Sequence, residues 1–226
     1  YGQLGRGSPV YYSPNPGAVT GVATAVAMTG GGQHTCAVLV DGTASCWGWN
    51  GYGQLGDGTT TDSARPVAVQ GLTTATAISS GVQHTCAVLG DGGANCWGHN
   101  GYGQLGDGSM TDSATPMAVS GITAAVALDA GYYHTCAVLD DGTAHCWGYN
   151  ISGQLGDGST TGSVVPVGVA GITTGALTWS SDSSAATIDE TGLATGVSRG
   201  IATITATSGD VSGSTTLTVR RRTFRP

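Results

Sequence analysis

The chain has 226 residues, of which 39% are hydrophobic and only 9% are charged. This composition is sufficient for a packed core and excludes a disordered polyelectrolyte. Residues 1–219 contain three of the seven Arg and all fourteen acidic residues, a net charge of −11. We therefore expect neither nucleic acid nor anionic lipid as a partner. No apolar run approaches the roughly 18 residues that span a bilayer, so we expect no membrane insertion.

Short motifs recur along the chain at intervals close to 50 residues. The sequence HTCAVL begins at residues 34, 84 and 134, CWG begins at 46, 96 and 146, and GQLG begins at 2, 53, 103 and 153. A proline recurs at the same interval, at Pro16, Pro66, Pro116 and Pro166. Because the first residue is Tyr1 and lies inside a repeat, we expect the chain to be part of a longer protein.

Each repeat predicts four short β-strands. In the second repeat these are residues 75–80, 84–89 and 94–98, and a long Gly-rich loop follows them. A fourth strand at 65–70 is assigned to the start of the same unit, and Pro66 indicates that it is an outer edge strand. Four strands at a fixed period are typical of a β-propeller blade, with a solenoid as the alternative. We predict an all-β fold with about three and a half such repeats.

The motifs HTCAVL, DGT, CWGxN and YGQLGDG, together with the spaced prolines, resemble the regulator of chromosome condensation repeat over residues 1–172. The resemblance implies blades of a seven-bladed propeller. The Cys-containing version is similar to the bacterial, secreted branch of the family, whose fold a secreted beta-lactamase inhibitor protein shares. Three and a half blades cannot close such a ring, so we expect a partial ring whose open blade edges allow self-association.

The sequence changes character after residue 172. Residues 176–219, with Trp179, Ile188 and the ATITAT run, resemble a bacterial Ig-like domain of group 2. The strands expected before Leu177 are missing, so residues 173–219 are interpreted as the C-terminal half of that domain, an incomplete β-sandwich. Such a fragment has open edges and half a core, and it either docks on the last blade or is poorly ordered. Residues 220–226 form an Arg-rich tail that we expect to be disordered.

The six cysteines form three pairs, each ten residues apart and each flanking a DG turn. If residues 40–42 form a three-residue hairpin loop, Cys36 and Cys46 face each other at a Cα separation of roughly 4.5 Å, which a disulfide can bridge. Zinc bound by His34 and the two cysteines, or buried free thiols, are the alternatives. We predict disulfides, and therefore an oxidising compartment, for the pairs Cys36–Cys46, Cys86–Cys96 and Cys136–Cys146.

The sequence contains no evident catalytic constellation. A cysteine held in a disulfide is no nucleophile, so we expect the His that begins each HTCAVL strand to hydrogen-bond a neighbouring loop. Asp57 and its equivalents are too isolated for calcium and are interpreted as loop caps. We predict no enzyme activity, no catalytic residue, no metal and no cofactor. The tryptophan of each CWG indicates packing between blades: Trp47, Trp97 and Trp147.

The repeats differ from one another mainly in the loops after the first and third strands, which lie on one face of the blades. This face carries aromatic rings, and the opposite face carries the nearly invariant DG turns. Aromatic residues on loops are good contact residues. The alternative is that the rings only fill the seams between blades. The candidate partner-binding residues are Trp49, His99, Tyr132, Tyr133 and Tyr149.

These observations predict a recognition module of an extracellular or cell-surface bacterial protein, which binds a protein or glycan ligand through its propeller loops. Two alternatives stay open at this point. Some members of the family are guanine nucleotide exchange factors for small GTPases, but that role needs a reducing compartment. The repeats could also be the scaffold part of a larger secreted enzyme.

Overall fold

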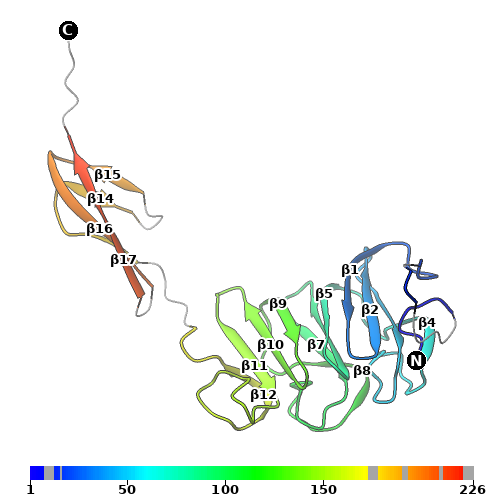
Figure 1. Ribbon diagram of the computed structural model, residues 1–226. Helices are drawn as coiled ribbons and strands as arrows, with labels where there is room; N and C mark the ends of the chain where they lie inside the picture. Colours follow the sequence, from blue (N-terminus) through cyan, green and yellow to red (C-terminus); the bar gives the residue numbers. More distant parts are fainter. Residues whose placement is uncertain (8–12, 16, 173–177, 190–192, 209–210, 221–226) are drawn as a thin grey trace. The chain divides into compact units, whose positions relative to one another are not determined.

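The computed structural model describes residues 1–7, 13–15, 17–172, 178–189, 193–208 and 211–220. The chain divides into two compact units, Tyr1–Ile172 and Thr173–Pro226 (Figure 1). The regular elements of the described residues are all β-strands. No helix in this part of the chain is long and apolar enough to cross a membrane.

The first unit contains three antiparallel sheets of four strands, one sheet per repeat. Figure 1 shows the three sheets in a row. The strands of the first sheet are β1 (Ala25–Gly30), β2 (His34–Leu39), β3 (Ala44–Gly48) and β4 (Ser63–Ala68). Those of the second are β5 (Ala75–Ser80), β6 (His84–Leu89), β7 (Ala94–Gly98) and β8 (Ser113–Ala118). Those of the third are β9 (Ala125–Ala130), β10 (His134–Leu139), β11 (Ala144–Gly148) and β12 (Ser163–Gly168).

The fourth strand of each blade differs from the sequence-based assignment. β4 pairs with β3, so it completes the blade that precedes it in sequence instead of beginning the next one. The long loop after CWG brings the chain back beside the strand that it has just left. Pro66 does lie on an edge strand, as predicted, because β4 is the last strand of its sheet.

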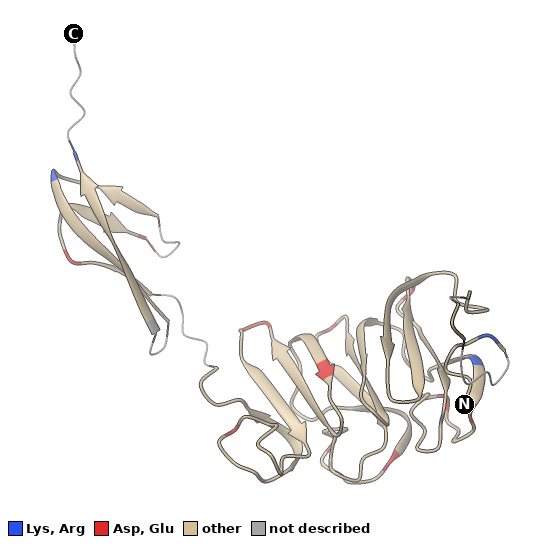
Figure 2. Ribbon diagram, in the orientation of Figure 1, with Lys and Arg blue, Asp and Glu red and all other residues tan. Residues whose placement is uncertain are grey.

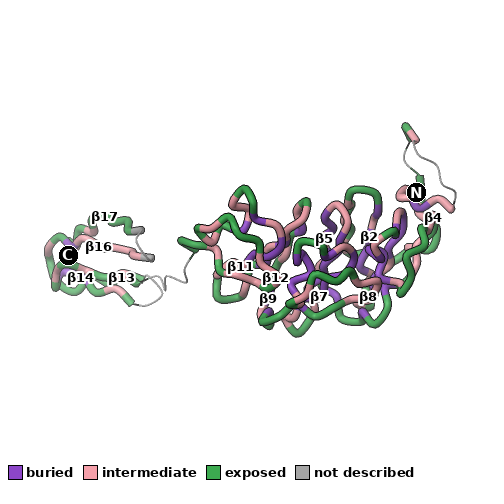
Figure 3. Tube along the Cα trace, turned by 90° about the horizontal axis from the view of Figure 1, so that it is seen from below, coloured by how far each residue is buried: buried purple, intermediate pink, exposed green. Residues whose placement is uncertain are grey.

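The core of the first unit lies between the blades. Val38 and the Cys36–Cys46 pair of the first blade pack with Ile78 and Trp97 of the second. The corresponding residues of the second blade pack in the same way with the third. Buried residues accordingly concentrate where neighbouring sheets meet (Figure 3). Each blade therefore has two different faces, one carrying the disulfide and one carrying the tryptophan.

The third blade shows what one of these faces looks like without a neighbour. The valine that follows each Cys-Ala is 0% exposed at Val38, 3% exposed at Val88 and 43% exposed at Val138. The three valines occupy the same position of the repeat, so the difference comes from the next blade alone. Among the described residues the disulfide face of the third blade is not covered by another blade. The predicted partial ring is confirmed in this respect.

The second unit contains two small sheets. One has the order β13-β16-β17 and the other pairs β14 with β15. A small core of Ala185, Ala186, Ala202 and Ile204 lies between them. The strands of this second unit are β13 (Thr178–Ser181), β14 (Ala186–Ile188), β15 (Ala194–Gly196), β16 (Gly200–Ser208) and β17 (Val211–Val219). The expectation that residues 220–226 are disordered concerns a tail of which 221–226 lie outside the described residues.

Candidate functional site

The long loop after each CWG is organised by one buried asparagine. In the first blade, Asn50 Nδ2 donates to the carbonyl oxygens of Thr59 and Thr61, at 3.0 Å and 3.1 Å. Its Oδ1 accepts the N–H of Leu55 at 2.9 Å. Asn100 and Asn150 make the equivalent bonds in the next two blades. The loop therefore has a defined conformation, and the aromatic side chains beside it are held by a rigid backbone.

The aspartates of the GDG segments are loop caps, as predicted. Asp57 Oδ1 accepts the N–H and the hydroxyl of Thr59, at 3.0 Å and 2.9 Å. Asp157 makes the same kind of contact with Ser159, and these hydrogen bonds hold the pKa of the Asp157 carboxyl below its usual range. Within the described residues, no group of three or more His, Cys, Asp or Glu could hold a metal ion.

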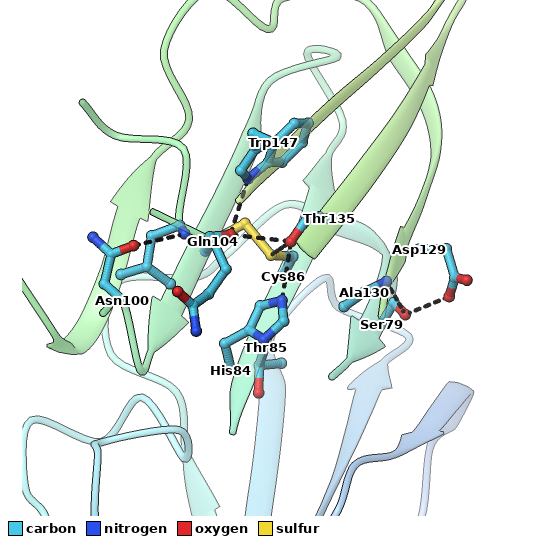
Figure 4. The surroundings of a disulfide bond; sticks show 12 residues. Ser79, His84, Thr85, Cys86, Asn100, Gln104, Asp129, Ala130, Thr135 and Trp147 are labelled. Carbon is cyan, nitrogen blue, oxygen red and sulfur yellow. Dashed lines mark hydrogen bonds between the residues drawn. A yellow bond between two sulfur atoms is a disulfide. The ribbon is translucent and has the colours of Figure 1, made fainter. Parts of the chain in front are cut away.

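A repeated set of hydrogen bonds joins each blade to the next. His84 Nε2 lies 2.9 Å from Thr135 Oγ1, and this hydroxyl donates to the Gln104 carbonyl at 3.0 Å (Figure 4). Trp147 Nε1 donates to the same carbonyl at 2.9 Å. The expected partner of the histidine was a neighbouring loop, and the actual partner is a strand residue of the next blade. The tryptophan packs between blades as predicted, with 0% of its surface exposed.

This arrangement determines the protonation of the buried histidines. Because the Thr135 hydroxyl donates to Gln104, its oxygen can only accept from His84, so the His84 proton lies on Nε2. Nδ1 is buried and has no hydrogen-bond partner among the described residues. Burial lowers the pKa of His84 to about 3 and that of His34, which bonds Thr85 in the same way, to about 4. Both imidazoles are neutral at physiological pH and act as structural donors.

The three predicted disulfides are present. Cys36–Cys46, Cys86–Cys96 and Cys136–Cys146 each join directly opposed residues of a hairpin, with a Cα separation of 4.1 Å. Gly42 of the first hairpin loop has φ +79°, the left-handed conformation that the three-residue loop requires. No free cysteine occurs in the described part of the chain, which contains all six. Cys bound to zinc and free thiols are therefore excluded.

The candidate binding residues lie in a continuous row of aromatic contacts that crosses all three blades. Trp49 contacts Tyr52, with ring centroids 5.4 Å apart, and Tyr52 contacts His99 of the next blade at 4.6 Å. His99 contacts Tyr102 and Tyr133, at 6.0 Å and 5.9 Å. We call this set the aromatic row; its members are Tyr1, Trp49, Tyr52, His99, Tyr102, Tyr132, Tyr133 and Tyr149.

The aromatic row both fills seams and presents a surface. The contacts Tyr52–His99 and Tyr102–Tyr133 each join two blades, so these rings do support the seams. Tyr132 is nevertheless 63% exposed and Tyr102 is 41% exposed. Tyr1, Tyr52 and Tyr102 were not among the candidate residues, although each occupies the same position of a YGQLG motif. That shared position was the signal in the sequence.

The aromatic row borders a cavity of about 410 Å³ where the second and third blades meet. We call it the tyrosine pocket; it is lined by Tyr102, Tyr132, Tyr133, His134, Tyr149 and Gln154. Three of the five candidate residues therefore line one cavity, whereas Trp49 and His99 lie further along the row. Desolvation raises the pKa of Tyr133 and lowers that of His134, so the site disfavours the charged form of both side chains.

Comparison with protein families identifies the repeats. Models of the regulator of chromosome condensation (RCC1) repeat match residues 41–88 and 91–138, and a second model of the same repeat matches 24–54, 75–104 and 125–154. Together these matches span more than half of the chain. The chain belongs to the RCC1 repeat family.

A bacterial Ig-like domain of group 2 matches residues 154–219. This match begins before β12, which is part of the last RCC1 blade. The second unit thus contributes only the later strands of the match, in agreement with the predicted incomplete Ig-like domain.

Solved structures support the RCC1 fold. Prp20p from Saccharomyces cerevisiae is 21% identical, with a TM-score of 0.63, over 77% of this chain and 46% of that one. Human WBSCR16 is 25% identical, with a TM-score of 0.58, over 65% of this chain and 38% of that one. The chain thus spans less than half the length of these two proteins. Comparison with curated protein sequences gives no match.

Proposed function

We propose that the RCC1 unit is a non-catalytic recognition module of an extracellular or cell-surface bacterial protein, and that it binds a protein partner through the aromatic row. The observation that carries this proposal is the continuity of the row across three blades. Aromatic side chains bury a large area at low entropic cost, and they are enriched among residues that dominate protein interfaces. The RCC1 repeat fold itself is consistent with a protein-interaction or regulatory module.

The disulfides support the proposed location outside the cell. Bonds of this kind persist in oxidising environments and are rare in the cytosol. All six cysteines are paired, and Cys36 and Cys86 are completely buried. The structure of Prp20p was described together with its binding properties to Gsp1p and histones. An exchange role of the kind known for some family members requires a reducing compartment, so the disulfides favour recognition outside the cell.

The proposal can be tested before the partner is identified, by selecting peptides that bind the chain from a displayed random library. The selection uses the chain with its disulfides intact. We expect the selected peptides to bind the aromatic row, because exposed rings on a rigid backbone are the strongest contact sites of this surface. Changing Tyr132 and Tyr149 to Ala should weaken binding by roughly 1 to 2 kcal/mol each.

The matched control changes the opposite face. Thr43→Ala and Thr143→Ala alter two DG turns whose hairpins stay closed by disulfides, and they should leave peptide binding unchanged. Peptides that lose affinity with the threonine variants and not with the tyrosine variants would mean that the aromatic row is the wrong face. A selection that yields no binding peptide, while a glycan array gives tyrosine-dependent binding, would replace the protein partner with a carbohydrate.

A further inference from the structure

The tyrosine pocket has aromatic walls on more than one side. Tyr102 contacts Tyr149 with ring centroids 5.0 Å apart and an interplanar angle of 70°. Tyr132 contacts Tyr133 at 4.5 Å and 89°. The rings that line the pocket therefore have clearly different orientations. The face of an aromatic ring carries partial negative charge and attracts cations.

Among the described residues, no charged side chain lines this pocket. Its remaining lining residues are Gln154 and His134, and desolvation lowers the pKa of His134, which disfavours the charged imidazolium. A cation that enters the pocket meets no positive charge from its lining, whereas a carboxylate or phosphate would meet no cationic partner there.

The net negative charge of the whole RCC1 unit also favours a cationic ligand. Residues 1–172 contain ten Asp, two Arg and no Lys. Figure 2 shows how sparse the charged residues are and that most of them are acidic. Such a surface attracts cationic groups at long range and repels anionic ones.

We propose that the tyrosine pocket receives the guanidinium group of an arginine that the protein partner presents. A guanidinium is planar, so it stacks on aromatic faces, and its five N–H groups can donate to tyrosine hydroxyls and to the Gln154 side chain. The volume of about 410 Å³ accommodates one such side chain. This inference rests on the proposed function, because it assigns the chemistry of the partner at that surface.

The test compares two probes that differ in charge and have nearly the same shape. N-acetyl-arginine amide and N-acetyl-citrulline amide are titrated separately into the isotope-labelled chain, and backbone amide shifts are followed by NMR. We expect saturable shifts around residues 132–134 and 149–154 with the arginine probe. The citrulline probe should bind roughly two- to fivefold more weakly than the arginine probe. This is the factor that a cation–π contact supplies at an exposed site.

Variants locate the effect. Tyr149→Ala removes a ring of the pocket and should abolish the saturable shifts. Thr143→Ala changes a DG turn on the opposite face of the blades, and it should leave them unchanged. A chain in which the four tail arginines are changed to Gln removes guanidinium groups that could compete: Arg220, Arg221, Arg222 and Arg225.

Three results would overturn the proposal. Equal binding of the two probes would show that charge is not recognised. Shifts spread over the acidic surface without saturation would show only non-specific attraction, and the absence of shifts would show that the pocket takes no arginine. Each of these outcomes is compatible with selected peptides that still depend on Tyr132 and Tyr149, so the failure of this inference is distinguishable from the failure of the proposed function.

Discussion

The hydrogen bond between blades can be removed by replacing Thr135 with Val. The two side chains have nearly the same shape, and Thr135 is 0% exposed, so the packing of the seam is retained. The substitution removes the acceptor of the His84 Nε2–H, which lies 2.9 Å away, and the donor to the Gln104 carbonyl at 3.0 Å. The free energy of unfolding of the variant therefore reports on these two bonds.

The expected loss of stability follows from the hydrogen bonds that His84 and Gln104 retain in the variant. The His84 Nε2–H becomes a buried donor without an acceptor, which costs roughly 1 to 3 kcal/mol. The Gln104 carbonyl still accepts the Trp147 Nε1–H at 2.9 Å, so leaving it without the threonine hydroxyl costs less. We expect the stability to fall by roughly 2 to 3 kcal/mol. Thr85→Val should cost the same, because Thr85 makes the equivalent bonds to His34 and Gln54.

Thr35 provides a control within the chain. It occupies the same position of the first blade and donates to the Gln3 carbonyl at 3.0 Å, but no histidine of the described residues bonds it. Thr35→Val should therefore cost only about 1 kcal/mol. Urea unfolding without reductant, followed by tryptophan fluorescence, measures all three variants. Equal losses for Thr35, Thr85 and Thr135 would refute the role of the histidine, and no loss at Thr85 or Thr135 would refute the seam bonds altogether.

Three further predictions concern the RCC1 unit. The low pKa values of His34 and His84, about 4 and about 3, lie below the unfolded value of 6.5. The contribution of these histidines to the free energy of unfolding should therefore be fully present above pH 6.5. It should fall as the pH drops toward 5, by up to about 1.4 kcal/mol per pH unit for each histidine. Urea midpoints at pH 7.5 and 5 test this, and the midpoint of a His34→Gln, His84→Gln double variant should change less between the two pH values. Mild reductant should open Cys136–Cys146 first, since Cys136 is partly exposed and Cys36 and Cys86 are buried; alkylation and peptide mapping would show another order if the reasoning fails. Gly106→Ala should destabilise by at least about 1 kcal/mol more than Gly121→Ala, because both have positive φ but only the Cβ at 106 would lie 2.7 Å from Trp147 Nε1; thermal unfolding that gives equal losses would contradict this.

The sequence predicted what is encoded within one hairpin. The strands expected at 75–80, 84–89 and 94–98 coincide with β5, β6 and β7. The disulfide pairs followed from hairpin register alone, because the loop length and the position of Gly42 determine which residues face each other. These are local relations between residues about ten apart, and they do not depend on the neighbouring blade.

Relations between blades were harder to predict. The segment at 65–70 is closer in sequence to residue 75 than to β3, so proximity favoured the wrong sheet. The pairing of β4 with β3 depends on the folded loop that Asn50 organises. Thr85, the partner of His34, is 51 residues away, in the following repeat. A single repeat contains no signal for that contact, because its donor and acceptor come from two copies of the same motif.

The two different faces of each blade also explain where the repeats are free to vary. Gly32 lies so close to the next blade that a Cβ there would be 2.8 Å from the Val82 carbonyl oxygen. At the equivalent position of the third blade stands Tyr132, which is 63% exposed and contacts Tyr133. A large ring is tolerated at this position because no described blade packs against it. The variation that creates the tyrosine pocket therefore occurs where the geometry of the seam permits a large side chain. The His, Thr and Trp residues that hydrogen-bond one blade to the next repeat unchanged.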